Sequence, residues 1–221
     1  MKRLPEPELM DDPEQALAYA QADFSAAHGA RVEIFKSLYP GLRLEGAALD
    51  LGCGSGDVLL RFARAFPSVT FFGLDGSQPM LDLAQRAIDA EPSLVPRVRL
   101  QFGIIPQGPF PAQPWALIMS HSLLHQLHHP EALWGTIKEC GPSGCAVFVA
   151  DLRRPPSEAD ARRVVSVTSK NEPEILQRDF FNSLCAAFEP DEVREQLARA
   201  GLAHMQVRTH DPFHLTVHGI L

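Results

Sequence analysis

Cysteine is scarce in this sequence: its 221 residues include four cysteines, and none has the CxxC spacing of a zinc site. This excludes a disulfide scaffold and leads us to expect a reducing, cytoplasmic compartment. Long apolar runs are missing too, because no stretch approaches the roughly 18 residues that cross a membrane. The first residues, Met1 to Glu8, contain no apolar segment like that of a signal peptide.

Positive charge is also in short supply. Lys and Arg number 20 against 27 Asp and Glu, which gives a net charge of −7 with neutral histidines. General nucleic-acid binding requires a basic surface that neutralises phosphates, so the charge balance argues against it. Hydrophobic residues make up 45% of the chain, and a chain of this length can bury a large core without disulfides or metals. We find no internal repeat and no linker, and expect one domain spanning 1–221.

Short apolar segments alternate with helical patterns along the middle of the chain. We expect strands at residues 47–51, 69–74, 98–102, 115–119 and 145–150, and helices at 57–66, 78–90 and about 130–140. This alternation is typical of βαβ units. It predicts an α/β fold, with a Rossmann-like, mostly parallel sheet and helices on both faces.

The two ends of the chain complete this plan. Residues 1–40 are expected to hold a loose arm (1–10) and then amphipathic helices, ahead of the core at 46–151. In the remainder, 152–221, we expect helices near 157–169, 173–187 and 190–200 and strands near 203–208 and 213–218. The short turn Asp211-Pro212 predicts that these last strands form an antiparallel hairpin, which brings the sheet to seven strands.

Three glycines, Gly52, Gly54 and Gly56, directly follow the first expected strand and open the next helix. Glycine lets a ligand approach the main chain, and free N–H groups point outward from a helix N-terminus. A dinucleotide site has the pattern G-x-G-x-x-G and binds a pyrophosphate there. This chain has G-x-G-x-G, with Asp57 at the position of the third glycine, and its carboxylate would repel a phosphate.

Several motifs, in order, resemble those of the class I S-adenosylmethionine-dependent methyltransferases. The first is Ala48-Leu-Asp-Leu-Gly-Cys-Gly-Ser-Gly56, and the second is Gly73-Leu-Asp75-Gly-Ser-Gln-Pro-Met80. The segment Leu117-Ile-Met-Ser-His121, followed by Leu124-His-Gln-Leu127, is similar to the fourth, and Gly141-Pro-Ser-Gly144 resembles the turn before strand five. The resemblance covers roughly residues 46–151. It implies the fold and S-adenosylmethionine as cofactor, but not the methyl acceptor.

The resemblance also implies roles at the matching positions. Asp75 would accept hydrogen bonds from the two ribose hydroxyls, Met80 would pack on the adenine, and Ser120 would lie beside the sulfonium. Asp50 and Asp75 would help the site suit a cation, and the backbone around Gly52 would meet the methionine moiety. The implied cofactor contacts are Asp50, Gly52, Cys53, Gly54, Gly56, Asp75, Gly76, Met80, Gly103, Ile104, Ser120 and His121.

One position departs from the family pattern. Many members carry an acidic residue after the third strand that binds the adenine amino group, but here Phe102 is followed by Gly103, Ile104 and Ile105. Adenine contacts would then come from the backbone and apolar side chains of Gly103 and Ile104. This leaves weaker cofactor binding or a modified cofactor open.

Four histidines, His121, His125, His128 and His129, lie within nine residues. His121 and His125 are four apart and would share one face of a helix, a spacing that could suggest a metal. No suitably spaced third ligand is near, so we expect no metal. Packing or capping and a role facing the substrate both remain open. His121 is the best-placed general base, since an unperturbed imidazole has a pKa of about 6.5.

Outside the motifs, Tyr19, Phe24 and His28 lie on the helices before strand one, which cover the site as a lid in this family. The alternative is that these side chains pack in the core. We include Tyr19 among the candidate catalytic residues. Arg153 and Arg154 follow strand five and could pair with a carboxylate or phosphate of the substrate. Solvated arginines are the alternative.

We therefore expect an enzyme that transfers a methyl group from S-adenosylmethionine to a small-molecule acceptor, with no nucleic-acid or membrane partner. The first alternative keeps the fold and cofactor for other chemistry, such as cofactor conversion or a cofactor-assisted rearrangement. The second is a non-catalytic, cofactor-binding partner subunit. If the protein is an enzyme, we expect an acceptor pocket beside Ser120 and His121. If it is a non-catalytic partner subunit, we expect side chains to fill that pocket and an apolar patch to be exposed elsewhere.

Overall fold

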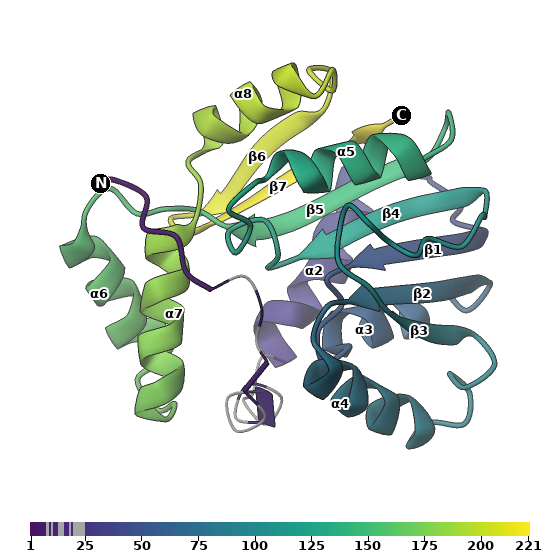
Figure 1. The fold of residues 1–221 in the computed structure, drawn as a ribbon, viewed down its shortest axis with the longest axis horizontal. Coiled ribbons are helices and arrows are strands. Elements are labelled where there is room, and N and C mark those ends of the chain that lie inside the picture. The colour runs from purple at the N-terminus through teal and green to yellow at the C-terminus, as the bar shows by residue number, and fades with distance from the viewer. Residues whose placement is uncertain (8, 10, 13–15, 18, 20–24) are drawn as a thin grey trace.

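A computed structural model describes the whole chain except residues 8, 10, 13–15, 18 and 20–24. Seven strands form one sheet in the order β3-β2-β1-β4-β5-β7-β6 (Figure 1). Neighbouring strands among β1 to β5 run parallel, whereas β7 runs antiparallel to both β5 and β6. The strands are β1 (Gly46–Leu51), β2 (Val69–Asp75), β3 (Val98–Phe102), β4 (Trp115–His121), β5 (Ala146–Leu152), β6 (Gln206–Asp211) and β7 (His214–Ile220).

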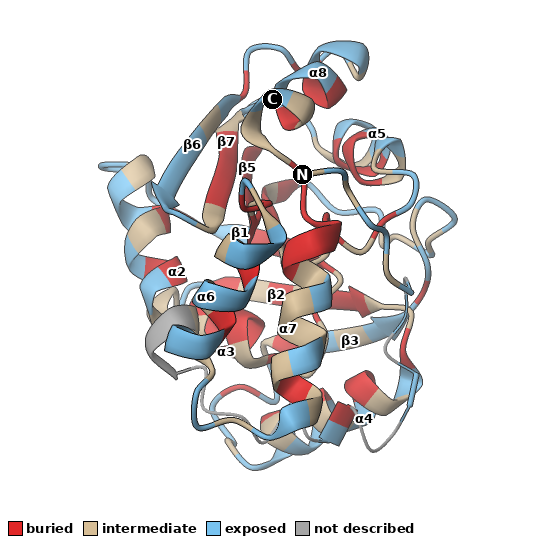
Figure 2. Ribbon diagram, turned by 90° about the vertical axis from the view of Figure 1, so that its left-hand side faces the viewer, coloured by how far each residue is buried: buried red, intermediate tan, exposed pale blue. Residues whose placement is uncertain are grey.

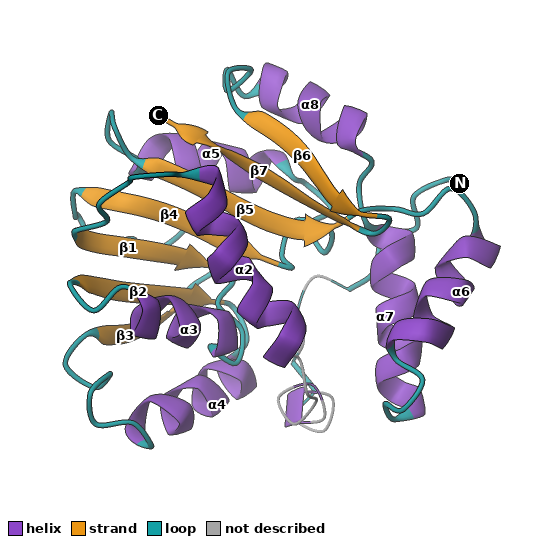
Figure 3. Ribbon diagram, turned by 180° about the vertical axis from the view of Figure 1, so that it is seen from behind, coloured by secondary structure: helices purple, strands orange, loops and turns teal. Residues whose placement is uncertain are grey.

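Helices cover both faces of this sheet, which confirms the predicted α/β class. One face packs on α2, α3 and α4, which lie in front of the sheet in Figure 3, and the other packs on α5 and α8. The helices are α2 (Ser25–Leu38), α3 (Asp57–Ala65), α4 (Gln78–Asp89), α5 (Glu131–Cys140), α6 (Glu158–Thr168), α7 (Glu174–Ala186) and α8 (Pro190–Arg199).

Strand residues alternate between these two layers, as side chains of a β-strand must. Ala48 belongs to the core on the α2–α3 face, whereas Leu49 belongs to the core on the α5–α8 face. In β4 the same alternation sends Met119 to the first core and Ile118 to the second. This parity decides below which side chains at the strand ends reach the site.

Helices α6 and α7 stand beyond the carboxyl ends of the parallel strands, away from the two sheet faces (Figures 1 and 3). They are held by a third apolar cluster, which includes Leu152 at the end of β5 and Leu184 of α7. Each of the two helices buries one side and exposes the other (Figure 2). Because ligands of such sheets bind at the carboxyl ends of the strands, α6 and α7 wall in the expected site.

The first seven residues are not the expected loose arm. The N–H of Leu4 donates to the carbonyl of Cys185 at 3.0 Å, and the Arg3 side chain donates to the carbonyls of Ala186, His125 and Leu127. The guanidinium of Arg3 also lies 4.0 Å from the centre of the Phe188 ring. The arm is therefore fixed across α7 and the loop after β4 by contacts that are distant in sequence.

Residues 13–15, within the segment expected to hold amphipathic helices, and the side chain of Phe24 lie outside the described residues. Within the described part of the chain, no helix is both long and apolar enough to cross a membrane.

Candidate active site

A cavity of about 760 Å³ opens at the carboxyl ends of β1, β2 and β4. Its volume lies toward the upper end of the range of about 300–1,000 Å³ that is usual for small-molecule sites. One wall, called the loop side here, consists of Asp50, Gly52, Cys53, Gly54, Ser55, Asp75, Gly76, Ser77, Met80, Gly103 and Ile104. The opposite wall, called the α7 side, consists of Arg31, His121, His125, Leu176, Asp179, Phe180, Ser183, Phe213 and His214.

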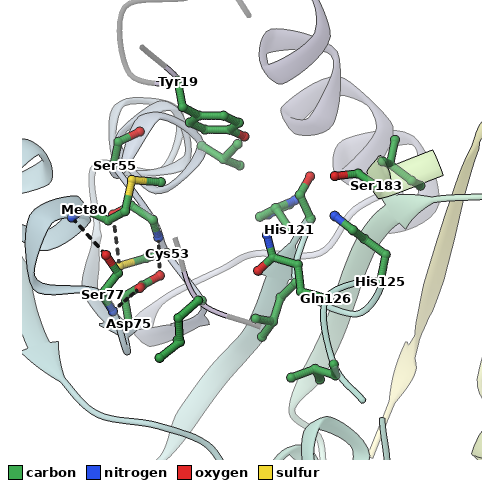
Figure 4. A pocket seen from close by; sticks show the side chains of 18 of the residues that line it. Tyr19, Cys53, Ser55, Asp75, Ser77, Met80, His121, His125, Gln126 and Ser183 are labelled. Atoms are coloured by element: carbon green, nitrogen blue, oxygen red, sulfur yellow. Dashed lines mark hydrogen bonds between the residues drawn. The ribbon is translucent and has the colours of Figure 1, made fainter. Parts of the chain in front are cut away.

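Figure 4 shows the two walls facing each other across the cavity. Cys53, Asp75 and Met80 lie on one side, and His121 and Ser183 lie on the other. Most of the residues that sequence motifs assigned to the cofactor are therefore brought together on the loop side.

The glycine loop is fastened to the end of β2 by Asp75. One carboxylate oxygen accepts the N–H of Gly54 at 2.7 Å, and the other accepts the N–H of Ser77 at 2.8 Å. Gly52 and Gly54 have φ values of 72° and 54°, which favour glycine over residues with a side chain. Burial raises the pKa of Asp75, although these two N–H donors oppose the shift.

Asp50, the last acid of β1, is 1% exposed and lines the cavity. Its Oδ1 has no hydrogen-bond partner among the described residues. Burial raises the pKa of this carboxyl well above its ordinary value, and the nearby charge of Asp75 raises it further. A buried carboxylate without a partner is costly, so this position favours a cationic ligand.

At the remaining loop-side glycines the backbone is packed closely against neighbouring residues. A Cβ on Gly54 would lie 3.3 Å from Cε of Met80, and a Cβ on Gly76 would lie 3.0 Å from Cγ1 of Ile104. Gly103 is closer still to its neighbours, since a Cβ there would lie 2.5 Å from the carbonyl oxygen of Gly108. Gln107, which the motif comparison missed, adds an amide to the cavity lining next to Ile104.

Two expected cofactor contacts lie outside the cavity lining. Gly56 adopts φ 82° at the start of α3, where a Cβ would meet Cβ of Ala84 at 3.0 Å, so it allows α3 and α4 to pack closely. Ser120 is fully buried and donates its hydroxyl to the carbonyl of Leu51 at 2.7 Å. Strand alternation turns Ser120 away from the face that carries His121, which is why it is not among the residues that line the cavity. Its expected place beside the sulfonium stays a prediction.

His121 lines the cavity with its ring among aromatic side chains. Its ring centre lies 5.7 Å from that of Phe62 and 5.5 Å from that of Phe148. Neither ring nitrogen has a hydrogen-bond partner among the described residues. Burial lowers the pKa of His121 well below its ordinary value, and the charge of Arg31 lowers it further. The imidazole is thus neutral at pH 7, but it is a weak base.

His121 and His125 do not share a helix face, because His121 ends β4 and His125 lies in the following turn. His125 instead joins two carboxylates. Its Nδ1 lies 2.6 Å from Oδ1 of Asp151, and its Nε2 lies 3.3 Å from Oε1 of Glu6 in the N-terminal arm. Ser183 completes the chain of contacts by donating to Glu6 at 3.0 Å.

The electrostatic effect of these partners on His125 exceeds that of burial. Burial alone would lower the pKa of His125, but the charge and hydrogen bond of Asp151 produce a net rise. Burial also raises the pKa of Glu6. An imidazole held by a buried aspartate is a stronger base than a free one. Among the described residues, no group of three or more His, Cys, Asp or Glu side chains is arranged to hold a metal ion.

Tyr19 and His28, from the segment before β1, also line the cavity. His28 Nδ1 lies 2.6 Å from Oδ2 of Asp57, which also accepts from Arg61 at 3.0 Å. Burial would raise the pKa of Asp57, but His28 and Arg61 lower it to about 2. Burial raises the pKa of Tyr19 to about 12, so its phenol stays protonated at neutral pH.

The two arginines after strand five have no place in this cavity lining. Arg154 is 5% exposed and pairs with Glu189 at 3.2 Å and Glu192 at 2.8 Å, which makes it a structural cation. Arg153 lies at a separate, shallow pocket next to the β6–β7 turn. Instead, Arg31 of α2 lines the cavity. Sequence reasoning missed it, because Arg31 belongs to no motif and is brought to the site only by the packing of α2.

Comparison with known proteins now adds to this geometry. Residues 48–144 match the family model described as a methyltransferase domain. An uncharacterized methyltransferase of Schizosaccharomyces pombe is 29% identical over 100 residues, which are 43% of this chain and 36% of that protein. The chain thus spans just over a third of the length of this curated relative.

Solved structures are similar over nearly the whole chain. The plantazolicin methyltransferase BpumL, in complex with SAH, superposes with a TM-score of 0.69 at 15% identity and covers 94% of this chain and 90% of its own. A SAM-dependent methyltransferase from Aquifex aeolicus gives a TM-score of 0.67 at 16% identity, covering 94% and 97%. At these identities the likeness shows the fold.

Proposed function

We propose that this chain, which belongs to the S-adenosylmethionine-dependent methyltransferases of class I fold, transfers the methyl group of S-adenosylmethionine to a small-molecule acceptor. The observation that carries this proposal is the single cavity with two unlike walls. Its loop side has the groups that the cofactor needs, and its α7 side leaves room for a second molecule. An open cavity of this kind favours an enzyme over a partner subunit with a filled pocket.

The loop side fits the cofactor on observations of this chain. The carboxylate of Asp75 faces the cavity and suits two ribose hydroxyls, although it also accepts two backbone N–H groups. The unpartnered oxygen of Asp50 suits a cationic amine. Met80 and Ile104 give apolar surfaces for adenine. When bound, S-adenosylmethionine would supply an electrophilic methyl group on a sulfonium.

The chain's own contribution is to orient the acceptor and to exclude water. Tyr19 and the bridged pair His28–Asp57 line the cavity, and we assign to them the exclusion of water. An acceptor with a protonated nucleophile needs a base, and His121 is the candidate, because both ring nitrogens of His125 already face carboxylates. Asp151 holds His125 at 2.6 Å and stabilises its protonated form, whereas the buried His121 is neutral and can accept a proton.

Calorimetric titration with S-adenosylhomocysteine and with NAD⁺ tests the cofactor assignment. We expect one molecule of S-adenosylhomocysteine to bind per chain and NAD⁺ not to bind, because Asp57 replaces the third glycine of a dinucleotide loop. The reverse preference would overturn the proposal.

A labelling experiment tests the acceptor class. The protein is incubated with S-[methyl-³H]adenosylmethionine and separated protein, nucleic-acid and low-mass fractions of a cell extract. We expect the label to enter the low-mass fraction only. At a cofactor concentration below saturation, Asp75→Asn should lower this transfer strongly, and the matched control Asp89→Asn, on the exposed side of α4, should retain it. Label in the protein or nucleic-acid fraction would contradict a small-molecule acceptor.

A further inference from the structure

Arg31 is a buried cation with no direct ionic partner in the part of the chain that the structure describes. It lies on α2, is 7% exposed and lines the cavity. Its guanidinium carries a permanent charge and five N–H donors in a planar fork. Within the described residues it forms no hydrogen bond and no ion pair. Burying a charge without a partner lowers the stability of a protein substantially. We therefore expect such an arginine to have a ligand as its partner.

The acids around Arg31 are already engaged. Burial lowers the pKa of Arg31, and the charges of Asp151 and Asp211 oppose this shift. Asp151, however, binds His125 and accepts the N–H groups of Leu124 and Leu152. Asp211 binds His214 at 2.7 Å. Neither carboxylate contacts the guanidinium, which leaves its donors available to a molecule in the cavity.

Arg31 lines the same cavity as His121 at the end of β4 and His214 at the start of β7. Burial lowers the pKa of His214, and the charge of Arg31 lowers it further. Burial and the charge of Arg31 lower the pKa of His121 in the same way. The neighbouring walls are apolar and include Leu176, Phe180 and Phe213.

We propose that Arg31 binds an anionic oxygen group, a carboxylate or phosphate, of the methyl acceptor. The acceptor is then a small organic acid whose apolar body packs on Phe180 and Phe213. This inference rests on the proposed function, because the bound anion is a methyl acceptor only if the protein transfers methyl groups. Charge-assisted, two-pronged hydrogen bonds are the strong contacts that arginine makes with such groups. The carboxylate of the cofactor is the other oxyanion that could reach a guanidinium in this cavity, and the experiment separates the two.

The test measures binding of matched probes to the full chain saturated with S-adenosylhomocysteine. Benzoate and phenyl phosphate are the anionic probes, and benzamide is the neutral probe of nearly the same shape. We expect wild type to bind an anionic probe at least about tenfold more tightly than benzamide, because charged hydrogen bonds contribute roughly 1.5–3 kcal/mol. Arg31→Met should remove this preference, and Arg43→Met, an exposed arginine, should keep it. Equal binding of the anionic and neutral probes to wild type would overturn the inference.

Two further measurements separate the alternatives. Affinities for S-adenosylhomocysteine and for 5′-methylthioadenosine, which lacks the amino-acid part, are compared in wild type and Arg31→Met. A tenfold loss confined to S-adenosylhomocysteine would assign Arg31 to the cofactor carboxylate and refute the acceptor. If wild type binds benzoate without binding S-adenosylhomocysteine, the proposed function fails while the anion site stands.

A thermal melt of Arg31→Met without ligand guards against misfolding. Because the variant removes an unpaired buried charge, it should melt at the wild-type temperature or above it. A fall in the melting temperature would show that Arg31 is paired within the protein and would contradict the inference. Arg31→Lys keeps the charge without the fork and should retain only part of the preference for anions.

Discussion

Asp50→Asn should stabilise the protein without ligand and destabilise it with ligand. The wild-type carboxylate is 1% exposed and has one oxygen without a described partner. Replacing it with an amide of the same shape removes the need to bury a charge. In the bound protein the same charge attracts the cofactor amine, so its loss weakens binding. The variant should therefore show opposite effects in the two states.

The size of both effects follows from the burial of Asp50. An unsatisfied buried polar group costs about 1–3 kcal/mol. For a chain of this length each kcal/mol shifts the melting temperature by roughly 2–4 °C, so ligand-free Asp50→Asn should melt about 2–12 °C higher. A charged hydrogen bond contributes roughly 1.5–3 kcal/mol, which predicts about tenfold to a hundredfold weaker binding of S-adenosylhomocysteine.

The pH dependence of the effect has a fixed sign. The folded pKa of Asp50 is raised by burial above the unfolded value of about 3.9. As pH rises, the unfolded chain releases this proton first, so the wild-type protein loses stability from about pH 4 up to the folded pKa. The advantage of Asp50→Asn should therefore grow with pH over that window and be smallest in acid.

Thermal melts from pH 4 to 8, with and without saturating S-adenosylhomocysteine, measure both effects, and calorimetry gives the affinity. Asp89→Asn, an exposed residue of α4, is the matched control and should change neither quantity. A ligand-free Asp50→Asn that melts below wild type at pH 7 would refute the reasoning. So would an unchanged affinity.

Three other variants probe the site, and a fourth tests the role of Ser120. Asp75→Asn should weaken S-adenosylhomocysteine binding by at least about tenfold in calorimetry, and an unchanged affinity would place the ribose elsewhere. His121→Phe should flatten the loss of stability below about pH 6.5 in thermal melts, because the folded histidine stays neutral while the unfolded one gains a proton; an identical pH profile would contradict this. Tyr19→Ala should lower turnover more than it lowers S-adenosylhomocysteine affinity, with a cooperative melt retained. Ser120→Ala should cost about 1 kcal/mol of stability in denaturant unfolding and leave S-adenosylhomocysteine affinity unchanged; a large loss of affinity would return Ser120 to the site.

The fold was predictable because its signals are local. Each parallel strand is a short apolar run followed by a turn and a helix, and the strands formed at the predicted positions to within a few residues. The loop side was predictable for the same reason, since Gly52, Gly54 and Asp75 lie in two short motifs that meet at adjacent strand ends.

The residues of the α7 side could not be predicted from local sequence motifs. Arg31, Ser183 and His214 come from three separate elements, and only the packing of those elements brings them to one cavity. The fixed arm was missed because Arg3 and Glu6 contact partners more than a hundred positions away. Ser120 lies at the predicted strand end, but the motif does not indicate on which face of the sheet its side chain lies, and the structure turns it toward the carbonyl of Leu51.

The division of the cavity into two walls has a consequence for how such a chain changes over evolutionary time. The loop side is built within residues 50–104, whereas the α7 side draws on α2, α7 and the start of β7. Mutations can therefore accumulate in the second group, altering which molecule is accepted, while the first stays intact. Laboratory chimaeras that exchange residues 158–186 between homologues should inherit their acceptor preference from the donor of that segment.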